Sequence, residues 1–252
     1  MAMPGQANCV GRRGHSASRL SGWAPFARHT AQYDAWFDSI EGRRIFDVET
    51  ACIRSLLADS PRPWLEVGVG TGRFAEALEI DEGLDPCPAV LRYAGRRGIR
   101  TRCGSAEALP YENGSFGTVM LIVTLCFLDD PVRALAECRR VLKEEGSILV
   151  GLVPKDSPWG KAYARQGAEG HPFYSVARFY RTQEIIALAA RSGFDLDQAA
   201  SCLPEMPGRA VDTRRAARDG IAKNAGFVAL RFGVNKKNRT VGRTAPKPGR
   251  MR

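Results

Sequence analysis

The segment Trp64–Gly72, WLEVGVGTG, decides the fold, because it joins a short apolar run to a turn that contains three glycines. Residues 64–69 predict a buried strand, and Gly68, Gly70 and Gly72 predict a tight turn that opens a helix. A loop without Cβ atoms lets a ligand lie directly on the main chain beside the N-terminus of that helix. The segment therefore predicts a site for a nucleotide-sized ligand behind the first strand.

The glycine spacing and the neighbouring charges indicate which ligand this is. Dinucleotide-binding loops read GxGxxG, whereas this loop reads GxGxG and has Arg73 where the last glycine of that pattern would stand. Glu66 would repel a pyrophosphate, but it suits the ammonium and sulfonium charges of S-adenosylmethionine (SAM). Asp85 ends the next expected strand, where an acid can accept hydrogen bonds from both ribose hydroxyls. The sequence therefore favours SAM over NAD(P).

Each of these features also has a purely structural interpretation. A glycine-rich turn is often only a turn, Glu66 could cap a helix, and Asp85-Pro86 is a common turn or helix start. Their order within a single strand–helix–strand unit favours the binding site.

The rest of the chain alternates between strand-like and helix-like segments. Two helical patterns, within Tyr33 to Ile40 and Ile45 to Leu57, precede the first strand. Strands are expected at 64–69, 83–84, 99–103, 117–125, 147–152, 194–199 and 226–232, and helices at 73–78, 88–96, 131–142 and 182–191. Such alternation implies parallel strands joined by right-handed helical crossovers. We expect an α/β fold with a seven-stranded, mostly parallel sheet and helices on both faces.

An insertion rich in aromatic residues, about 155–181, follows the fifth expected strand. Ligands of such sheets bind at the carboxyl ends of the strands, so the insertion and the first helical segment are expected to form a mostly apolar lid over a small organic ligand. The lid candidates are Trp36, Phe37, Trp159, Phe173, Tyr174 and Arg178. An equally plain interpretation is that half of the aromatic residues only pack the lid.

The formal charge of +10 lies at the two ends of the chain. Residues 1–32 carry four arginines and no acid, and residues 235–252 carry seven Lys or Arg and no acid. Of the 37 basic residues, 26 therefore lie between Tyr33 and Val234, together with all 27 acidic residues, so this part of the chain is nearly neutral. We expect basic, disordered tails at 1–28 and 235–252 around one domain at 29–234. Because basic tails bind nucleic acid, an RNA-modifying enzyme or RNA-binding module is the alternative hypothesis.

The composition also bears on membranes, metals and location. The longest nearly uninterrupted apolar run, Val119 to Leu128, is about half of the roughly 20 residues that a membrane-spanning helix needs. The seven cysteines stand singly, with no CxxC pair and no histidine at zinc spacing, so no metal site is expected. We expect a cytoplasmic protein, with organelle import by the Arg-rich N-terminus as the alternative. The sequence does not reveal the oligomeric state.

Four motifs in a fixed order carry a resemblance to a known family. They are WLEVGVGTGRFAEAL, GLDPCPAVLRYA, GSAEALPYENGSFGTVML and LDDPVRALAECRRVLKEEGSILVG. In this order the chain resembles the class I SAM-dependent methyltransferases of the small-molecule type, over roughly Tyr33 to Phe232. The segments YDAWFDS, IVTLCFLDDP, VPKDSPWG and GHPFYSVARFY resemble a narrower prokaryotic group of unassigned substrate, with one member labelled histamine-methyltransferase-like. The resemblance implies a Rossmann-like methyltransferase sheet.

The resemblance also implies roles for individual residues. Glu66 and the three glycines would hold the methionine part of SAM, and Asp85, followed by Pro86, the ribose. Ala106 and Glu107 would border the adenine, Thr124 would face the methionine or the methyl acceptor, and Tyr33 would close over the cofactor. The family usually has Asp at the positions of Ser105 and Gly117, so the adenine contacts and the local strand geometry are the doubtful points.

The chemistry of methyl transfer requires few catalytic groups. The leaving group of a sulfonium needs no protonation, so alignment of acceptor, methyl carbon and sulfur can supply most of the catalysis. His171 is the only histidine between Tyr33 and Val234 and is the candidate base, although a capped surface turn or a packing role is the commoner explanation for such a residue. A SAM-binding protein without catalysis is a third hypothesis.

Overall fold

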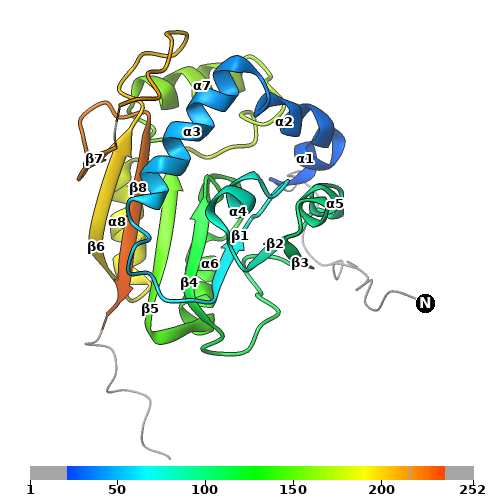
Figure 1. The fold of residues 1–252 in the computed structure, drawn as a ribbon, viewed down its shortest axis with the longest axis vertical. Coiled ribbons are helices and arrows are strands. Elements are labelled where there is room, and N and C mark those ends of the chain that lie inside the picture. Colours follow the sequence, from blue (N-terminus) through cyan, green and yellow to red (C-terminus); the bar gives the residue numbers. More distant parts are fainter. Residues whose placement is uncertain (1–21, 216, 236–252) are drawn as a thin grey trace, which may run out of the picture.

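The computed structural model describes residues 22–215 and 217–235 (Figure 1). The predicted tails therefore lie largely outside the described residues. The basic residues on which the RNA hypothesis depends lie mostly in those tails. One part of the N-terminal segment is described: Ala24–Arg28 forms the short helix α1, which the sequence analysis assigned to the tail. Its sequence, APFAR, is too short to show a helical period, and Pro25 occupies the first turn, where proline is tolerated.

One mixed sheet forms the centre of the molecule, with the strand order β3-β2-β1-β4-β5-β8-β6-β7. The strands are β1 (Trp64–Val67), β2 (Glu82–Asp85), β3 (Arg100–Cys103), β4 (Phe116–Ile122), β5 (Leu142–Leu152), β6 (Phe194–Cys202), β7 (Arg218–Asp219) and β8 (Phe227–Val234). β1 to β5 pair in parallel, whereas β8 is antiparallel to both β5 and β6. The expected α/β class and mostly parallel sheet are confirmed.

The expected number of seven strands is wrong, because the sheet has an eighth, β7. This strand is two residues long and pairs antiparallel with the edge of β6, through Ala200↔Asp219 and Ser201↔Arg218. Two exposed residues cannot display the alternating pattern by which a strand is recognised in a sequence. The wrong strand number therefore concerns only the edge of the sheet, where β7 is defined by its backbone pairing with β6.

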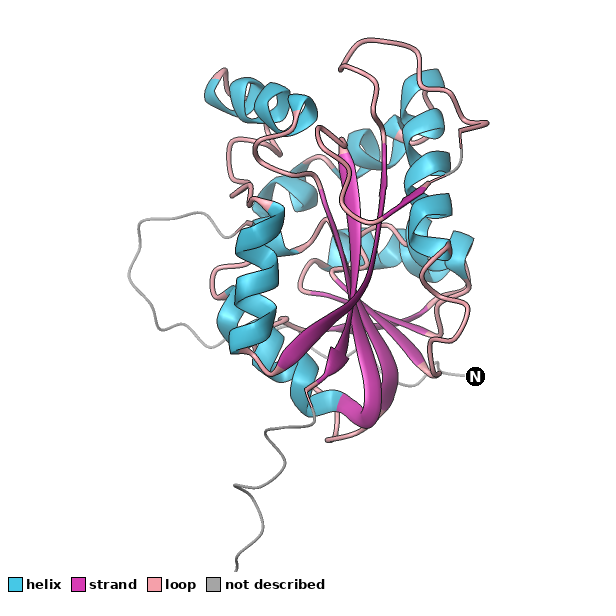
Figure 2. Cartoon of the chain, turned by 90° about the vertical axis from the view of Figure 1, so that its left-hand side faces the viewer, coloured by secondary structure: helices cyan, strands magenta, loops and turns pink. Residues whose placement is uncertain are grey.

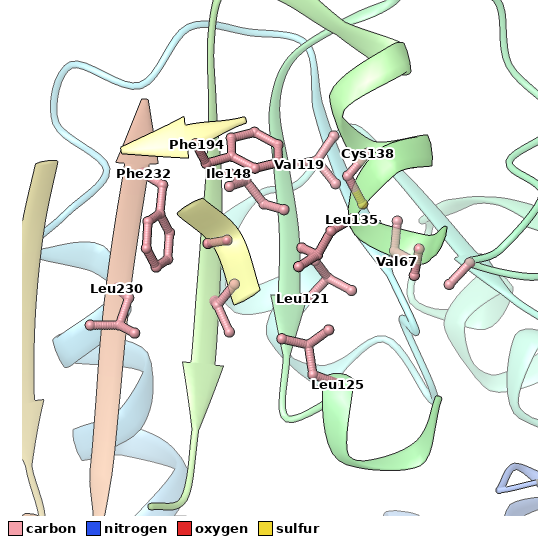
Figure 3. Packing of buried hydrophobic residues seen from close by; sticks show 14 of the residues in the cluster. Val67, Val119, Leu121, Leu125, Leu135, Cys138, Ile148, Phe194, Leu230 and Phe232 are labelled. Atoms are coloured by element: carbon pink, nitrogen blue, oxygen red, sulfur yellow. The ribbon is translucent and has the colours of Figure 1, made fainter. Parts of the chain in front are cut away.

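Helices cover both faces of the sheet, as Figure 2 shows. They are α2 (Thr30–Trp36), α3 (Ile40–Arg54), α4 (Arg73–Leu78), α5 (Pro88–Arg96), α6 (Pro131–Val141), α7 (Pro158–Ala168) and α8 (Thr182–Arg191). One core lies between the sheet and α6 and α8, and its packing is drawn in Figure 3. A second core lies between the other face and α3, α4, α5 and α7. Alternation along β1 places Leu65 and Val67 in the first core and Trp64 in the second.

Serine side chains cap the N-termini of α3 and α7, two of the helices in the upper part of Figure 1. The Ser39 hydroxyl accepts a hydrogen bond from the Gly42 N–H at 3.0 Å, and the Ser157 hydroxyl accepts one from the Gly160 N–H at 3.0 Å. Each bond satisfies an N–H group that the first turn leaves free. These caps fix where the two helices start and so how they cross the carboxyl ends of the strands.

Gly117 departs from the family pattern for a steric reason. A Cβ atom at this position would lie 2.3 Å from the carbonyl oxygen of Pro61. The backbone of the segment that leads into β1 passes directly over the start of β4, and the Gly117 N–H donates to the Pro63 carbonyl at 2.9 Å. An aspartate cannot fit here without moving that backbone.

Two absences concern the described residues only. No helix within residues 22–215 and 217–235 is long and apolar enough to cross a membrane. In the same part of the chain, no group of three or more His, Cys, Asp or Glu residues is placed to hold a metal ion.

Candidate functional site

A cavity of about 670 Å³ opens at the carboxyl ends of β1, β2 and β4, beneath α2, α3 and α7. Most of the residues predicted for the site line it. From the cofactor prediction these are Tyr33, Glu66, Gly68, Gly70, Asp85, Pro86, Ala106, Glu107 and Thr124. From the lid and base predictions they are Trp36, Phe37, Trp159, His171, Phe173 and Tyr174. The fold thus brings segments from six parts of the chain around one space.

The glycine loop between β1 and α4 has the backbone shape that its sequence requires. Gly68, Gly70 and Gly72 have φ values of +79°, +54° and +85°, which residues with a Cβ rarely adopt. At Gly68 a Cβ atom would also lie 2.5 Å from the Thr124 side chain. At Gly70 the nearest atom to a Cβ would be the Tyr33 hydroxyl at 3.6 Å, so the main chain there faces the open cavity. A ligand can therefore approach this backbone closely.

Glu66 points from β1 toward this loop and is 2% exposed. Burial raises the pKa of its carboxyl group well above the usual value, and the nearby Asp85 charge raises it further. The backbone N–H of Ala75 in α4 opposes this shift by hydrogen bonding to the carboxylate. The other oxygen, Oε2, is buried without a hydrogen-bond partner among the described residues. A buried acceptor without a donor is costly, so it marks a place where a ligand would supply the donor.

Asp85 stands at the end of β2 with both of its carboxylate oxygens oriented by the backbone. Oδ2 accepts from the Gly70 N–H at 3.0 Å, and Oδ1 accepts from the Cys87 N–H at 2.9 Å. Burial raises the pKa of Asp85 to about 6, although these two N–H groups lower it. Each oxygen keeps a second lone pair, so the side chain can still accept two hydroxyl groups of a ligand.

An ionic network fastens α2 onto the glycine loop, and sequence reasoning missed it. Arg73, the first residue of α4, donates to Asp34 at 2.9 and 3.0 Å and to Asp38 at 2.7 and 2.8 Å. Arg97 joins the same cluster through Asp34 at 3.1 Å and the Thr71 carbonyl at 2.9 Å. Bidentate arginine–carboxylate pairs fix geometry well. Arg73 therefore also holds α2 against the glycine loop.

Tyr33 is carried by that helix and lies over the loop. Its ring packs edge-to-face on Phe26 and Phe37, with centroids 5.1 and 5.4 Å away. Burial raises the pKa of its hydroxyl, and the Glu66 and Asp85 charges raise it further. The hydroxyl is therefore a neutral group at the mouth of the glycine loop.

The strand-end segments after β3 and β4 complete this side of the cavity. The Ser105 hydroxyl is hydrogen bonded to the Glu107 carboxylate, so the serine that replaces the family's usual aspartate is engaged by its neighbour. Ala106 beside it is buried. After β4, Val123 has a φ of +51°, which is strained for a β-branched residue, and the strand stops there instead of continuing to Leu125. The Thr124 side chain, which follows, lies beside Gly68.

The insertion after β5 supplies an aromatic wall. The rings of Tyr163, Tyr174 and His171 stack in sequence, with centroids 4.4 Å and 4.2 Å apart. Trp159 meets Tyr163 edge-to-face at 5.9 Å, is 3% exposed, and donates from Nε1 to the Glu205 carbonyl at 2.6 Å. Trp159 therefore belongs to the core as well as to the cavity, as the plainer interpretation of the aromatic residues held.

The comparisons with known proteins agree with this arrangement. Residues 65–150 match a methyltransferase domain family. A SAM-dependent methyltransferase of Thermotoga maritima, described as a possible histamine N-methyltransferase, superposes with a TM-score of 0.78 at 32% identity, over 84% of this chain and 100% of the other. The chain belongs to the class I SAM-dependent methyltransferases.

Two further proteins are similar to this methyltransferase over much of its length. An uncharacterised protein of Mycobacterium tuberculosis is 41% identical over 213 residues, which are 84% of this chain and 75% of the relative. A demethylmenaquinone methyltransferase of Thermotoga maritima is 27% identical over 172 residues, or 57% of this chain and 75% of the relative. SAM is the methyl donor that the family implies.

Two predicted site residues of the methyltransferase do not line the cavity. A Cβ atom at Gly72 would lie 2.9 Å from the Ala94 backbone, so this glycine allows α5 to pack against the loop. Arg178 is exposed, its guanidinium lies over the Tyr180 ring at 5.0 Å, and its N–H donates to the Cys126 carbonyl at 2.7 Å. The Arg178 side chain therefore lies at the surface and not in the cavity.

Other lining residues of the methyltransferase were not predicted. Glu49, in the middle of α3, and Gln166, on α7, both line the cavity. Glu49 occupies a buried position of an amphipathic helix where an apolar residue is usual, and that misplaced charge was the available signal. Gln166 carries no comparable signal.

Proposed function

We propose that this methyltransferase holds SAM on the glycine loop and transfers its methyl group to a small organic acceptor under the aromatic insertion. The observation that carries the proposal is the buried, unpartnered Oε2 of Glu66 beside a glycine loop open to the cavity. A carboxylate in this position favours a ligand with a positive charge and an N–H donor. The residues present therefore fit SAM.

The neighbouring residues would divide the remaining parts of SAM among them. Glu66 would accept from the ammonium group, and Asp85, with its oxygens oriented by Gly70 and Cys87, would accept from the ribose hydroxyls. Ala106 and Glu107 would border the adenine, and Thr124 would face the reacting end. When bound, SAM supplies an electrophilic methyl carbon on a sulfonium.

The catalytic contribution of the chain in this proposal is alignment and exclusion of water. Tyr33 and Phe37, fastened by the Arg73 network, cover the site from α2, and the stacked rings of the insertion cover it from the other side. Holding an acceptor in line with a bound methyl donor converts a bimolecular reaction into an effectively unimolecular one. The cavity volume of about 670 Å³ lies within the usual range of ligand sites, so the acceptor is small.

His171 stays a candidate base within this proposal. It lines the cavity, and burial lowers the pKa of its imidazole, which favours the neutral form that can take a proton. Its Nδ1 accepts the Tyr174 N–H at 3.4 Å, so that nitrogen is already used to hold the turn. Only Nε2 would be available for an acceptor.

Calorimetric titration with SAM, S-adenosylhomocysteine and NADH tests the proposed function. The first two are expected to bind and the third is not, because the Glu66 carboxylate opposes a pyrophosphate. Binding of NADH in place of SAM would refute the proposal. Screening of metabolite extracts for mass gains of one methyl group, with a Gly70→Arg variant as the blocked control, then separates an enzyme from a silent SAM-binding protein.

A further inference from the structure

A second buried carboxylate, Glu49, lines the cavity from α3. Its residue is 8% exposed and lines the cavity together with Trp159, Tyr163 and Tyr174 of the insertion. It makes no hydrogen bond or ion pair with any other residue that the structure describes. Burial raises the pKa of Glu49 to about 8. A carboxylate in this state is costly for the free protein, so a cationic ligand would relieve the cost.

The groups around Glu49 are those that recognise positively charged ligands. Burial is the main cause that raises the pKa values of the Tyr163, Tyr174 and Tyr33 hydroxyls, and the Glu49 charge lies near enough to raise all three further. The stacked Tyr163 and Tyr174 rings and the buried Trp159 line the same cavity as Glu49. Aromatic faces next to an acid bind ammonium groups through cation–π attraction and charge pairing together.

The charge balance of the whole cavity points the same way. Among the described lining residues the acids are Glu41, Glu49, Glu66, Asp85, Glu107 and Asp129. Arg73 is the only arginine or lysine among these described lining residues, and its guanidinium is already paired with Asp34 and Asp38. An anionic acceptor would meet uncompensated repulsion here, whereas a cationic one would be attracted.

We propose that the methyl acceptor is a small primary or secondary amine, which Glu49 binds as an ammonium ion and from which Glu49 takes a proton. This inference rests on the proposed function, since it assigns the acceptor of the same site. Glu66 serves the donor side at the glycine loop, and Glu49 serves the acceptor side beneath α7. Two separate buried acids thus match two separate cations.

The proton and electron movements balance in this assignment. The ammonium passes one proton to the Glu49 carboxylate and becomes a neutral amine with a free lone pair. That lone pair forms the new C–N bond while the C–S bond breaks, and the electron pair of the broken bond stays on sulfur. The product leaves as a methylated ammonium, and the protonated Glu49 releases its proton to solvent.

Calorimetric binding in the presence of saturating S-adenosylhomocysteine tests the proposal without turnover. The probes are propylamine, benzylamine and 2-phenylethylamine, each beside its alcohol of the same skeleton. We expect at least one amine to bind tenfold or more tightly than its alcohol. Loss of one partner of a buried charge pair costs about 30-fold or more in affinity, so Glu49→Gln should abolish the preference. Asp47→Asn removes an exposed carboxylate from the same helix, outside the cavity, and should keep it.

The outcomes separate this inference from the proposed function. Unchanged affinity of Glu49→Gln for S-adenosylhomocysteine shows that the variant is folded and that its donor site is intact. If S-adenosylhomocysteine binds but no amine is preferred, or if Glu49→Gln keeps the preference, the amine assignment is overturned while the proposed function stands. If S-adenosylhomocysteine itself does not bind to the native protein, the proposed function is overturned.

Discussion

Glu66→Gln is the substitution that most directly probes the donor site. Glutamine has the same shape as glutamate, so the packing around a residue that is 2% exposed should be kept. The change removes the negative charge from the unpartnered Oε2 that faces the glycine loop. A hydrogen bond to a charged group contributes about 1.5–3 kcal/mol, so affinity for SAM should fall by roughly 10- to 150-fold.

Calorimetry with both SAM and S-adenosylhomocysteine separates the two charges that Glu66 would serve. An equal loss for both ligands identifies the ammonium group, which they share, whereas a loss for SAM alone identifies the sulfonium. Glu112→Gln removes an exposed carboxylate outside the cavity and should change neither affinity. If Glu66→Gln binds SAM within twofold of the native protein, the assignment of Glu66 to the donor is refuted.

Three further predictions concern the frame around the site. Gly68→Ala, which places a Cβ 2.5 Å from Thr124 at a φ of +79°, should lower the midpoint of thermal unfolding more than Gly98→Ala, which has a φ of +81° and open space; equal losses would show that the contact is irrelevant. Arg73→Lys cannot bridge both of its carboxylates at once, so it should weaken SAM binding severalfold, and unchanged binding would contradict the role of the network. Burial raises the pKa of Glu49 from 4.5 to about 8, so between these pH values the folded state keeps a proton that the unfolded state has lost. The free energy of unfolding should therefore fall as the pH rises from 4.5 to about 8, by up to about 5 kcal/mol. Chemical unfolding of Glu49→Gln should show a flatter profile, and an unchanged slope would argue against the shift.

The donor half of the site was accessible from the sequence because it is local. Glu66, Gly68 and Gly70 lie within five residues of one another, and the backbone conformation of a glycine turn follows from its residue types. Asp85 could be added because parallel strands end at one edge of a sheet, so the ends of β1 and β2 must be neighbours. Phe173 and Tyr174 were predicted to line the site for the same reason, because their segment follows the carboxyl end of β5.

The sequence predictions and the structure differ where the outcome depends on distant contacts. Gly72 was assigned to the cofactor, but its absent Cβ makes room for Ala94 in α5. Arg178 was assigned to the lid, but the bond of its backbone to Cys126 leaves its side chain at the surface. The two-residue strand β7 exists only through pairing with β6. None of these contacts leaves a pattern along the chain.

The sequence by itself determined the fold class, the glycine loop and the sign of charge at the donor site, since these follow from residue type and spacing. Only the tertiary structure decided what surrounds the part of the cavity that we propose for the acceptor. It brought Glu49 from α3 into one cavity with Tyr163 and Tyr174 from the insertion, more than a hundred residues later in the chain. It also paired Arg73 with Asp34, which holds α2 over the glycine loop. Burial gives Glu49 its chemistry, and burial is a property of packing between distant segments, which spacing along the chain does not encode.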